Sequence, residues 1–305
     1  MQKSASQPLC NLCKSRKAKL LFRWNRYPDG WVGDIYKCEE CRLVYREPIF
    51  DKSAERKVSG SLEFRPDSPS RFDKRQKAIY LNILKQMEQY RCLNRVLDVG
   101  SGYGHFVKLS IDNGWEGIGV EPRSELAEFS ERNLGMPVRK VSFEKADLPE
   151  ASFDVITLIN VLEHLPDPLE ALLKANRLLR SGGAVFIRTP NAAFHVPIRF
   201  IAYRTYHCSR KVREFDVSKI SSYAFDKNTL SLYLSKANFT HPLVEGDAAS
   251  FCSHKSGGVS GERAARKALA WLSAVVKFST MGRCLVVSSL VAKASNEVGP
   301  FPANN

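Results

Sequence analysis

From residue 95 onward the sequence alternates short apolar runs with helical stretches of about ten to fourteen residues, and this alternation constrains the fold more than any other feature. Strands joined by helices run parallel, because the crossover returns the chain to the same edge of the sheet. The pattern therefore predicts an α/β domain with helices on both faces of a mostly parallel sheet. We expect strands over residues 95–99, 117–120, 138–141, 153–158, 184–188 and near 283–292, and helices over residues 71–90, 105–113, 124–134, 168–179 and 227–237, with Gly182-Gly183 as the C-terminal cap of the helix over 168–179.

The composition is that of an ordinary globular protein. With 305 residues, 44% hydrophobic and 26% charged, the chain is long enough to bury a core and is not collagen-like, coiled-coil or wholly disordered. Its long apolar stretches, such as 268–276 and 284–292, are far shorter than the roughly 18 to 20 residues of a membrane-spanning helix. Residues 1–8 lack the apolar segment of a secretory signal. We therefore expect a cytoplasmic protein without a transmembrane helix.

Four of the eight cysteines form two C-x-x-C pairs near the N-terminus. Such pairs present two thiolates from one tight turn, and two of them supply the four tetrahedral ligands of a structural zinc ion. Between the pairs, two short apolar segments flank the turn sequence at 27–30, which predicts a hairpin held by the metal. A chance pairing or a redox-active dithiol is the alternative. The expected zinc ligands are Cys10, Cys13, Cys38 and Cys41.

The net charge of +14 is concentrated at the two ends of the chain. Residues 1–50 carry 10 basic and 5 acidic side chains, and residues 191–305 carry 15 and 7. A basic surface attracts anions, so nucleic acid, a phosphorylated small molecule or an anionic membrane surface are all conceivable partners. The charges also fit an ordinary solvated surface, because net charge acts on solubility and encounter more than on fold.

A glycine-rich turn follows the first expected strand, in the string RVLDVGSGYGHF at 95–106. A strand that ends in such a turn and opens a helix lets a ligand approach bare backbone amides. The third glycine of a dinucleotide site is replaced by His105, which argues against pyrophosphate binding. Glu121 ends the next strand, where a carboxylate can accept both hydroxyls of a ribose. The pattern therefore predicts a nucleoside site.

With this string, and with its motifs in the same order, the chain resembles the class I S-adenosylmethionine-dependent methyltransferases over residues 71–240. The resemblance implies a Rossmann-like, seven-stranded, mostly parallel sheet with helices on both faces, preceded here by a small zinc-ribbon domain. It implies that Asp98 engages the methionine amino group and that Glu121 binds the ribose. Asp147 competes with Glu144 as the adenine-binding acid. The implied cofactor-binding set is Asp98, Gly100, Ser101, Gly102, Gly104, Glu121, Phe143, Glu144 and Asn160.

Further motifs point to one branch of that family. Residues 152–168 are similar to the family's fourth strand and following loop, and the RTPN string at 188–191 resembles the segment after its fifth strand. The string CRLVY at 41–45 is similar to the second knuckle of an N-terminal zinc ribbon in the branch that includes sugar and small-molecule methyltransferases. One departure is the string SSYAF at 221–225, where the branch often carries a histidine, so a substrate contact is absent or replaced.

His164 is the expected general base and Glu163 its orienting or substrate-binding partner. The loop after the fourth strand faces the methyl group in this fold, and an imidazole titrates near neutrality. The transfer itself is an in-line displacement that needs an aligned acceptor and, for a hydroxyl, removal of its proton. The alternative is that Glu163-His164 forms only a structural turn.

We expect three regions along the chain: a zinc ribbon at 1–50, a linker at 51–70 and a methyltransferase domain at 71–305. The domain would carry an insertion near 192–225 and a C-terminal helix plus edge strand at 260–295. The aromatic and basic insertion is a candidate lid, anion-binding wall or membrane contact. The basic segment at 263–278 is a candidate peripheral membrane helix at the inner membrane surface. Plain packing against the sheet explains both segments equally well.

The leading functional hypothesis is methyl transfer from S-adenosylmethionine to a small molecule, with zinc as a structural metal. The acceptor would be a sugar, a nucleotide-sugar or a lipid-linked glycan in polysaccharide or natural-product biosynthesis, and an anionic handle would fit the basic ends. An RNA methyltransferase with a phosphate-binding ribbon is the second hypothesis, although the chain lacks the Asn/Asp-Pro-Pro-Tyr/Phe string of amino-directed nucleic-acid methylation. A non-catalytic scaffold is the third, and the intact Asp98, glycine turn and Glu121 argue against it.

Overall fold

The computed structural model describes residues 8–24, 33–47, 72, 74–205, 221–247 and 289–296. The turn predicted at 27–30, the linker at 51–70, the helix at 263–278 and much of the insertion near 192–225 lie outside these residues. In the described part, no helix has the length and apolar character needed to cross a membrane.

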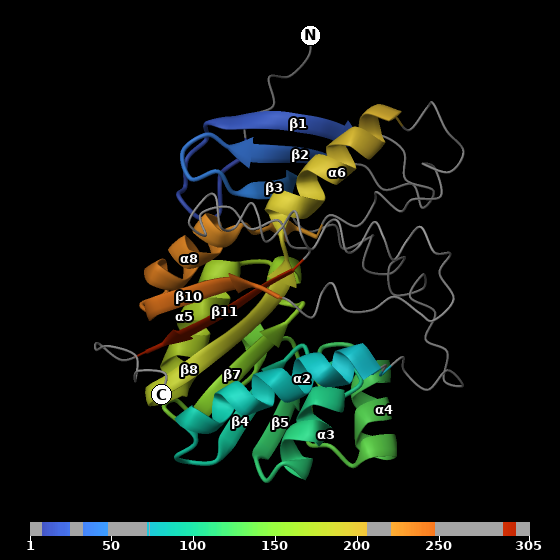
Figure 1. Cartoon of the computed structure of the whole chain (residues 1–305), viewed down its shortest axis with the longest axis vertical. Helices are drawn as coiled ribbons and strands as arrows, with labels where there is room; N and C mark the ends of the chain where they lie inside the picture. Colours follow the sequence, from blue (N-terminus) through green and yellow to red (C-terminus); the bar gives the residue numbers. More distant parts are fainter. Residues whose placement is uncertain are drawn as a thin grey trace.

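The large sheet has seven strands in the order β10-β11-β8-β7-β4-β5-β6 (Figure 1). All neighbouring pairs are parallel except those of β11, which runs antiparallel to both β8 and β10. This confirms the predicted Rossmann-like, mostly parallel sheet. The strands are β4 (Arg95–Val99), β5 (Glu116–Val120), β6 (Val138–Arg139), β7 (Phe153–Ile159), β8 (Leu179–Pro190), β10 (Thr240–Gly246) and β11 (Ser289–Ser295).

Helices cover both faces of this sheet because its central strands are apolar on both sides. Successive side chains of a strand point to opposite faces, so Val96 packs with α2 and α3 whereas Leu97 packs in the core that contains α5 and α8. The helices are α2 (Lys74–Met87), α3 (His105–Asp112), α4 (Ser124–Leu134), α5 (Pro168–Leu178), α6 (Ala192–Thr205) and α8 (Lys227–Lys236), with short 3-10 turns η1 (Glu88–Tyr90), η2 (Phe143–Lys145) and η3 (Leu162–His164).

Local capping signals place α5 and α8. The Asp167 carboxylate accepts the amides of Leu169 and Glu170 at the start of α5, and Asp226 forms a capping box with Thr229 at the start of α8. The predicted Gly182-Gly183 cap of α5 is wrong. The helix ends at Leu178, and both glycines lie in an irregular part of β8.

A second, four-stranded antiparallel sheet contains β1 (Ala18–Trp24), β2 (Gly33–Cys38), β3 (Val44–Glu47) and β9 (Tyr223–Ala224). The predicted pairing of the first two strands is confirmed, from Ala18 opposite Cys38 to Trp24 opposite Gly33. We call the described residues 8–24 and 33–47 the cysteine ribbon. Most of its buried side chains, Leu12, Leu43 and Tyr45 among them, are part of the same apolar core as α5 and α8, and α6 contacts β1 (Figure 1).

Candidate active site

The glycine turn after β4 has an open face toward the carboxyl edge of the sheet. Gly100, Gly102 and Gly104 have φ angles of 66°, 54° and 77°, in the left-handed region that favours glycine. A Cβ atom on Gly100 would lie 2.5 Å from a methyl of Val161, in the loop after β7. A Cβ atom on Gly102 would meet no atom within 4 Å. The turn is therefore packed on one side and accessible to a ligand on the other.

Glu121 is held against this turn by backbone amides. Its Oε2 accepts a 2.9 Å hydrogen bond from the Gly102 amide, and its Oε1 accepts one of 3.0 Å from the Arg123 amide. The side chain is buried, so these bonds fix the carboxylate while each oxygen keeps a lone pair for a further donor. Two fixed acceptor oxygens beside an open glycine turn are the chemistry that a ribose diol requires.

Asp98 is the second buried acid of the turn. The Thr157 hydroxyl donates to its Oδ1 at 2.6 Å, and no ion pair of the described residues includes it. Burial, with a smaller contribution from the charge of Glu121, raises the pKa of Asp98 to about 7, against the lowering effect of the Thr157 hydrogen bond. A buried carboxylate is costly without a cationic partner, so a ligand ammonium fits this position. The turn thus suits both the amino group and the ribose of S-adenosylmethionine.

The predicted adenine segment forms η2. Phe143 is buried in the core, whereas Glu144 is exposed. Lys174 on α5 fixes this turn, because its ammonium donates to the carbonyls of Phe143, Glu144 and Ala146 at 2.8, 3.2 and 2.6 Å. The ammonium also lies 5.2 Å from the Phe143 ring centre. Sequence reasoning missed Lys174, and the contact of Phe143 and Glu144 with adenine stays a prediction.

The two predicted catalytic side chains lie in the loop after β7 but have different surroundings. Glu163 is buried and accepts the Thr189 hydroxyl at 3.0 Å, and burial raises its pKa to about 7. His164 keeps an exposed surface although protein atoms crowd around the ring, and this desolvation, with the positive charge of Arg46, lowers the pKa of its imidazole. No hydrogen bond joins Glu163 to His164 in the described structure. Of the two side chains, only the histidine is exposed, and its role as general base stays a prediction.

Asn160, which is exposed, is bonded to a buried polar cluster that the sequence did not predict. Its backbone has a φ of 56°, and its Oδ1 accepts a 2.8 Å hydrogen bond from Nη1 of Arg188. The Arg188 Nε pairs with Asp247 at 2.9 Å, and its Nη2 donates to Ser289 at 3.2 Å. The only sequence signal was an arginine at the end of the apolar run in β8. This cluster ties the loop after β7 to the ends of β8, β10 and β11.

Tyr80 on α2 is a further residue that sequence reasoning missed. Gln76 donates to its hydroxyl oxygen at 2.8 Å, which leaves the phenolic proton available. Burial and the nearby charge of Asp98 raise the pKa of Tyr80 to about 12, so the hydroxyl stays protonated. Its ring packs edge-on against Phe106, 5.2 Å away, in the helix that follows the glycine turn. Tyr80 thus lies near enough to Asp98 for the charge of that carboxylate to act on its hydroxyl.

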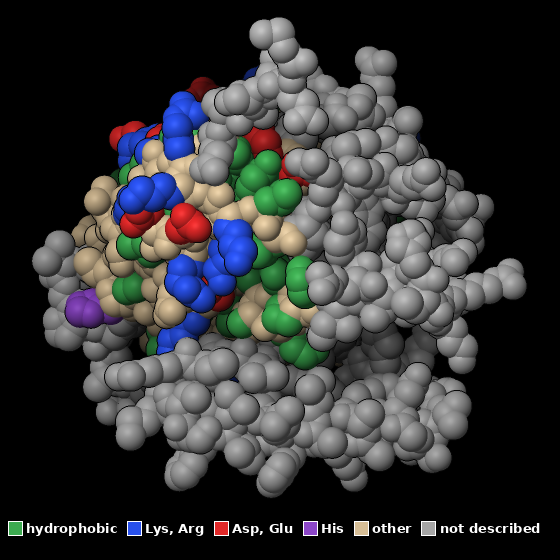
Figure 2. Space-filling model, turned by 90° about the horizontal axis from the view of Figure 1, so that it is seen from above, with side chains coloured by type: hydrophobic (Ala, Val, Ile, Leu, Met, Phe, Trp, Pro, Cys, Tyr) green, Lys and Arg blue, Asp and Glu red, His purple; other side chains and the backbone are tan. Residues whose placement is uncertain are grey.

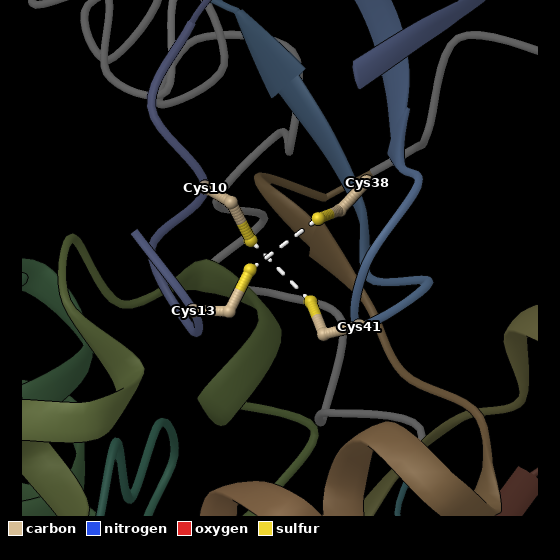
Figure 3. Close-up of side chains that lie close together, drawn as sticks. All are labelled: Cys10, Cys13, Cys38 and Cys41. Carbon is tan, nitrogen blue, oxygen red and sulfur yellow. Dashed lines mark hydrogen bonds between the residues drawn. The ribbon is translucent and has the colours of Figure 1, made fainter. Parts of the chain in front are cut away.

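The four predicted metal ligands lie together (Figure 3). The sulfur atoms are all within 4.8 Å of one another, with Cys10 3.5 Å from Cys41 and Cys13 3.4 Å from Cys38. Tetrahedral zinc with bonds near 2.3 Å places its sulfurs about 3.8 Å apart, so the donor set fits this ion. A hydrogen bond from Cys41 lowers the pKa of the Cys10 thiol to about 5, which favours the thiolate that a metal requires.

The seven-stranded fold and the acidic glycine turn define a class I S-adenosylmethionine-dependent methyltransferase. Residues 55–241 match the model of the methyltransferase-domain family, and because this is more than half of the chain, the protein belongs to that family.

Curated relatives match only a part of the chain. The chain is 34% identical over 103 residues to a ubiquinone biosynthesis O-methyltransferase of Methylococcus capsulatus, and 36% identical over 104 residues to that of Paracidovorax citrulli. Each match covers 32% of this chain and 44% of the relative, so the chain spans about half the length of the curated relatives it matches. A solved methyltransferase from Archaeoglobus fulgidus is similar at a TM-score of 0.48 and 18% identity, over 72% of this chain and 93% of that one.

Proposed function

We propose that this protein transfers a methyl group from S-adenosylmethionine to a hydroxyl of a small molecule. The observation that carries the proposal is the pair of buried carboxylates, Asp98 and Glu121, around an open glycine turn. S-adenosylmethionine supplies an activated methyl group on its sulfonium. Asp98 pairs with the amino group of this cofactor, and Glu121 accepts hydrogen bonds from its ribose hydroxyls. Tyr80 covers its methionine end.

In this proposal His164 removes the proton from the acceptor hydroxyl. Desolvation and Arg46 lower the pKa of the imidazole, so the ring is neutral and able to accept a proton at physiological pH. Glu163 is a support of the loop rather than an orienting partner, since its carboxyl is bound by Thr189 in the next strand. Asn160, held by Arg188, lines the site beside the acceptor.

For the acceptor we propose a sugar, a nucleotide-sugar or a lipid-linked glycan. The RTPN string and the cysteine pairs support this branch by resemblance, and the basic ends of the chain suit an anionic handle. The names of the curated relatives support a small-molecule acceptor and O-methylation. We further propose that Cys10, Cys13, Cys38 and Cys41 hold a structural zinc ion.

The RNA alternative finds little support on the described ribbon surface. Figure 2 looks down on this end of the molecule, where lysine and arginine side chains stand among acidic ones instead of forming an unbroken basic face. Lys17, one of the basic residues of the ribbon, pairs with Glu40 at 3.0 Å. Phosphate binding requires basic groups that are available to the backbone of the nucleic acid.

Two measurements test the proposal. Titration calorimetry should detect S-adenosylmethionine binding to the wild type, and Glu121→Ala should weaken it roughly ten- to hundredfold, because charge-assisted bonds to the ribose are lost. Equal affinity in both proteins would refute the site. Isotopically labelled S-adenosylmethionine, added with the protein to a fractionated cell extract, should label the sugar or lipid-linked pool. Label that disappears on ribonuclease treatment would refute the acceptor class.

A further inference from the structure

The sheet of the cysteine ribbon is completed by a strand from the methyltransferase domain. Strand β9 pairs with β3, with Ala224 opposite Val44 and Tyr223 opposite Tyr45. The Arg46 amide extends this pairing with a 2.9 Å hydrogen bond to the Ser222 carbonyl. The strand lies in the segment where the expected substrate histidine is absent. Its residues therefore serve the ribbon, and Tyr223 is buried instead of facing the site.

Tyr223 also contacts the loop that carries His164. Its hydroxyl donates a 2.9 Å hydrogen bond to the carbonyl of Pro166, two residues after the histidine. The ring is 1% exposed and stacks near Phe225, with centres 6.3 Å apart. Burial raises the pKa of Tyr223, so the hydroxyl remains a donor. One side chain thus joins the ribbon sheet to the loop after β7.

The ribbon is hydrogen-bonded to α8 at its first cysteine turn, and its second cysteine turn leads into β3. At the first turn, Tyr233 on α8 donates to the Asn11 side chain at 2.9 Å, and Lys236 donates to the Leu12 carbonyl at 2.8 Å. At the second turn, the Cys38 amide donates to the Leu43 carbonyl, next to the strand that pairs with β9. A metal that joins the two turns would hold β3 and α8 in one rigid frame.

We infer that the cysteine ribbon fixes the position of the His164 loop, and that Tyr223 is the positioning residue that connects the two. The inference rests on the proposed function only in treating this loop as the acceptor side of the site. The loop is bound from β8 through Glu163, from α5 through Asp167, and through Tyr223 from β9, the strand that pairs with the ribbon. The Tyr223 bond is the one nearest to His164 on its C-terminal side, so its loss frees the histidine most directly.

The test compares two tyrosine-to-phenylalanine variants of the full chain by hydrogen–deuterium exchange. Tyr223→Phe removes only the hydroxyl bond to Pro166 and keeps the ring and the β3–β9 pairing. We expect exchange in residues 161–168 to become about 2- to 10-fold faster, the factor that one lost hydrogen bond allows. Tyr233→Phe is the matched control, because it removes a hydroxyl bond to the ribbon from the same core without touching the loop.

The imidazole resonances of His164, assigned with His164→Gln, give a local readout that a general loss of stability would not move. They should shift in Tyr223→Phe and stay in place in Tyr233→Phe. Treatment of the wild type with a metal chelator should accelerate exchange in both the ribbon and residues 161–168.

Two results would overturn the inference. The first is exchange in residues 161–168 of Tyr223→Phe at the wild-type rate. The second is a chelator that accelerates exchange in the ribbon but leaves exchange in residues 161–168 unchanged. S-adenosylmethionine titrations on the same samples keep the two proposals apart. The inference predicts equal cofactor affinity in wild type and Tyr223→Phe, whereas failure of the wild type to bind would count against the proposed function alone.

Discussion

The backbone amide of Gly102 donates a 2.9 Å hydrogen bond to the Glu121 carboxylate, which joins the turns after β4 and β5 into one rigid rim. The bond needs the left-handed backbone of Gly102, whose φ is 54°. Because the space beside this glycine is open, the rim is both fixed and accessible.

Gly102→Ala should weaken S-adenosylmethionine binding about tenfold or more, since the new methyl would occupy the ligand side of the turn. A left-handed alanine also costs about 1–2 kcal/mol of folding free energy. Gly135→Ala is the control, because Gly135 has a φ of 65° and equally open space but caps α4. Calorimetry and urea unfolding should show similar destabilisation in both variants and weaker binding only in Gly102→Ala. Equal affinities would contradict the location of the cofactor.

Local signals in the sequence predicted much of this rim. The bounds of β4 and α4 were predicted to the residue, because a buried apolar run, a glycine turn and a helical period are all encoded by near neighbours. The pairing of β3 with β9 was not predicted, since it joins two short segments nearly 180 residues apart. The contacts of Arg188 with Asp247 and Ser289 are of the same kind, 59 and 101 residues apart. Strand β10, with only Val244 in the core, carries little apolar alternation to read.

The buried acids should give the ligand-free protein an unusual pH dependence. The pKa of Asp98 is raised to about 7 in the folded state, against about 3.9 in an unfolded chain. Between these values the folded protein holds a proton that the unfolded protein releases, so the free energy of unfolding falls as pH rises from about 4 to 7. Asp98→Asn should reduce this fall by roughly 1–4 kcal/mol.

Urea unfolding at pH 5, 6 and 7 measures this effect. Glu163, whose pKa is also raised to about 7, contributes a second part that Glu163→Gln should remove independently. The opposite outcome is a wild type that gains stability from pH 5 to 7, as expected of ordinary surface acids, and an Asp98→Asn variant with the same pH profile. That outcome would show that Asp98 is ionised in the folded state.

The Arg188–Asp247 pair should contribute far more to stability than the exposed pairs. Both side chains are nearly buried, at 11% and 8% exposure, so Arg188→Met leaves the Asp247 carboxylate without this guanidinium and should cost about 3–5 kcal/mol. The double variant Arg188→Met and Asp247→Asn should lose less free energy of unfolding than the two single variants together. Arg95→Met is the control, because Arg95 and Glu116 pair at 3.5 Å with both side chains about half exposed or more. A cost no larger than that of the control, about 1 kcal/mol or less, would contradict this role.

The cysteine cluster should bind close to one zinc ion per chain, measured by elemental analysis of the purified protein. Cys38→Ser replaces a buried ligand with a group of nearly the same size that binds zinc poorly, so the variant should lose the metal and unfold at lower urea concentration. Cys92→Ser changes an exposed thiol outside the cluster and should keep both the metal and the stability of the wild type. The two substitutions are chemically identical, so a difference in bound zinc between them comes from the cluster. A wild type that is folded and free of metal would show that the four thiols pack without an ion. A Cys38→Ser variant that retains its zinc would show that the ion does not depend on this thiol.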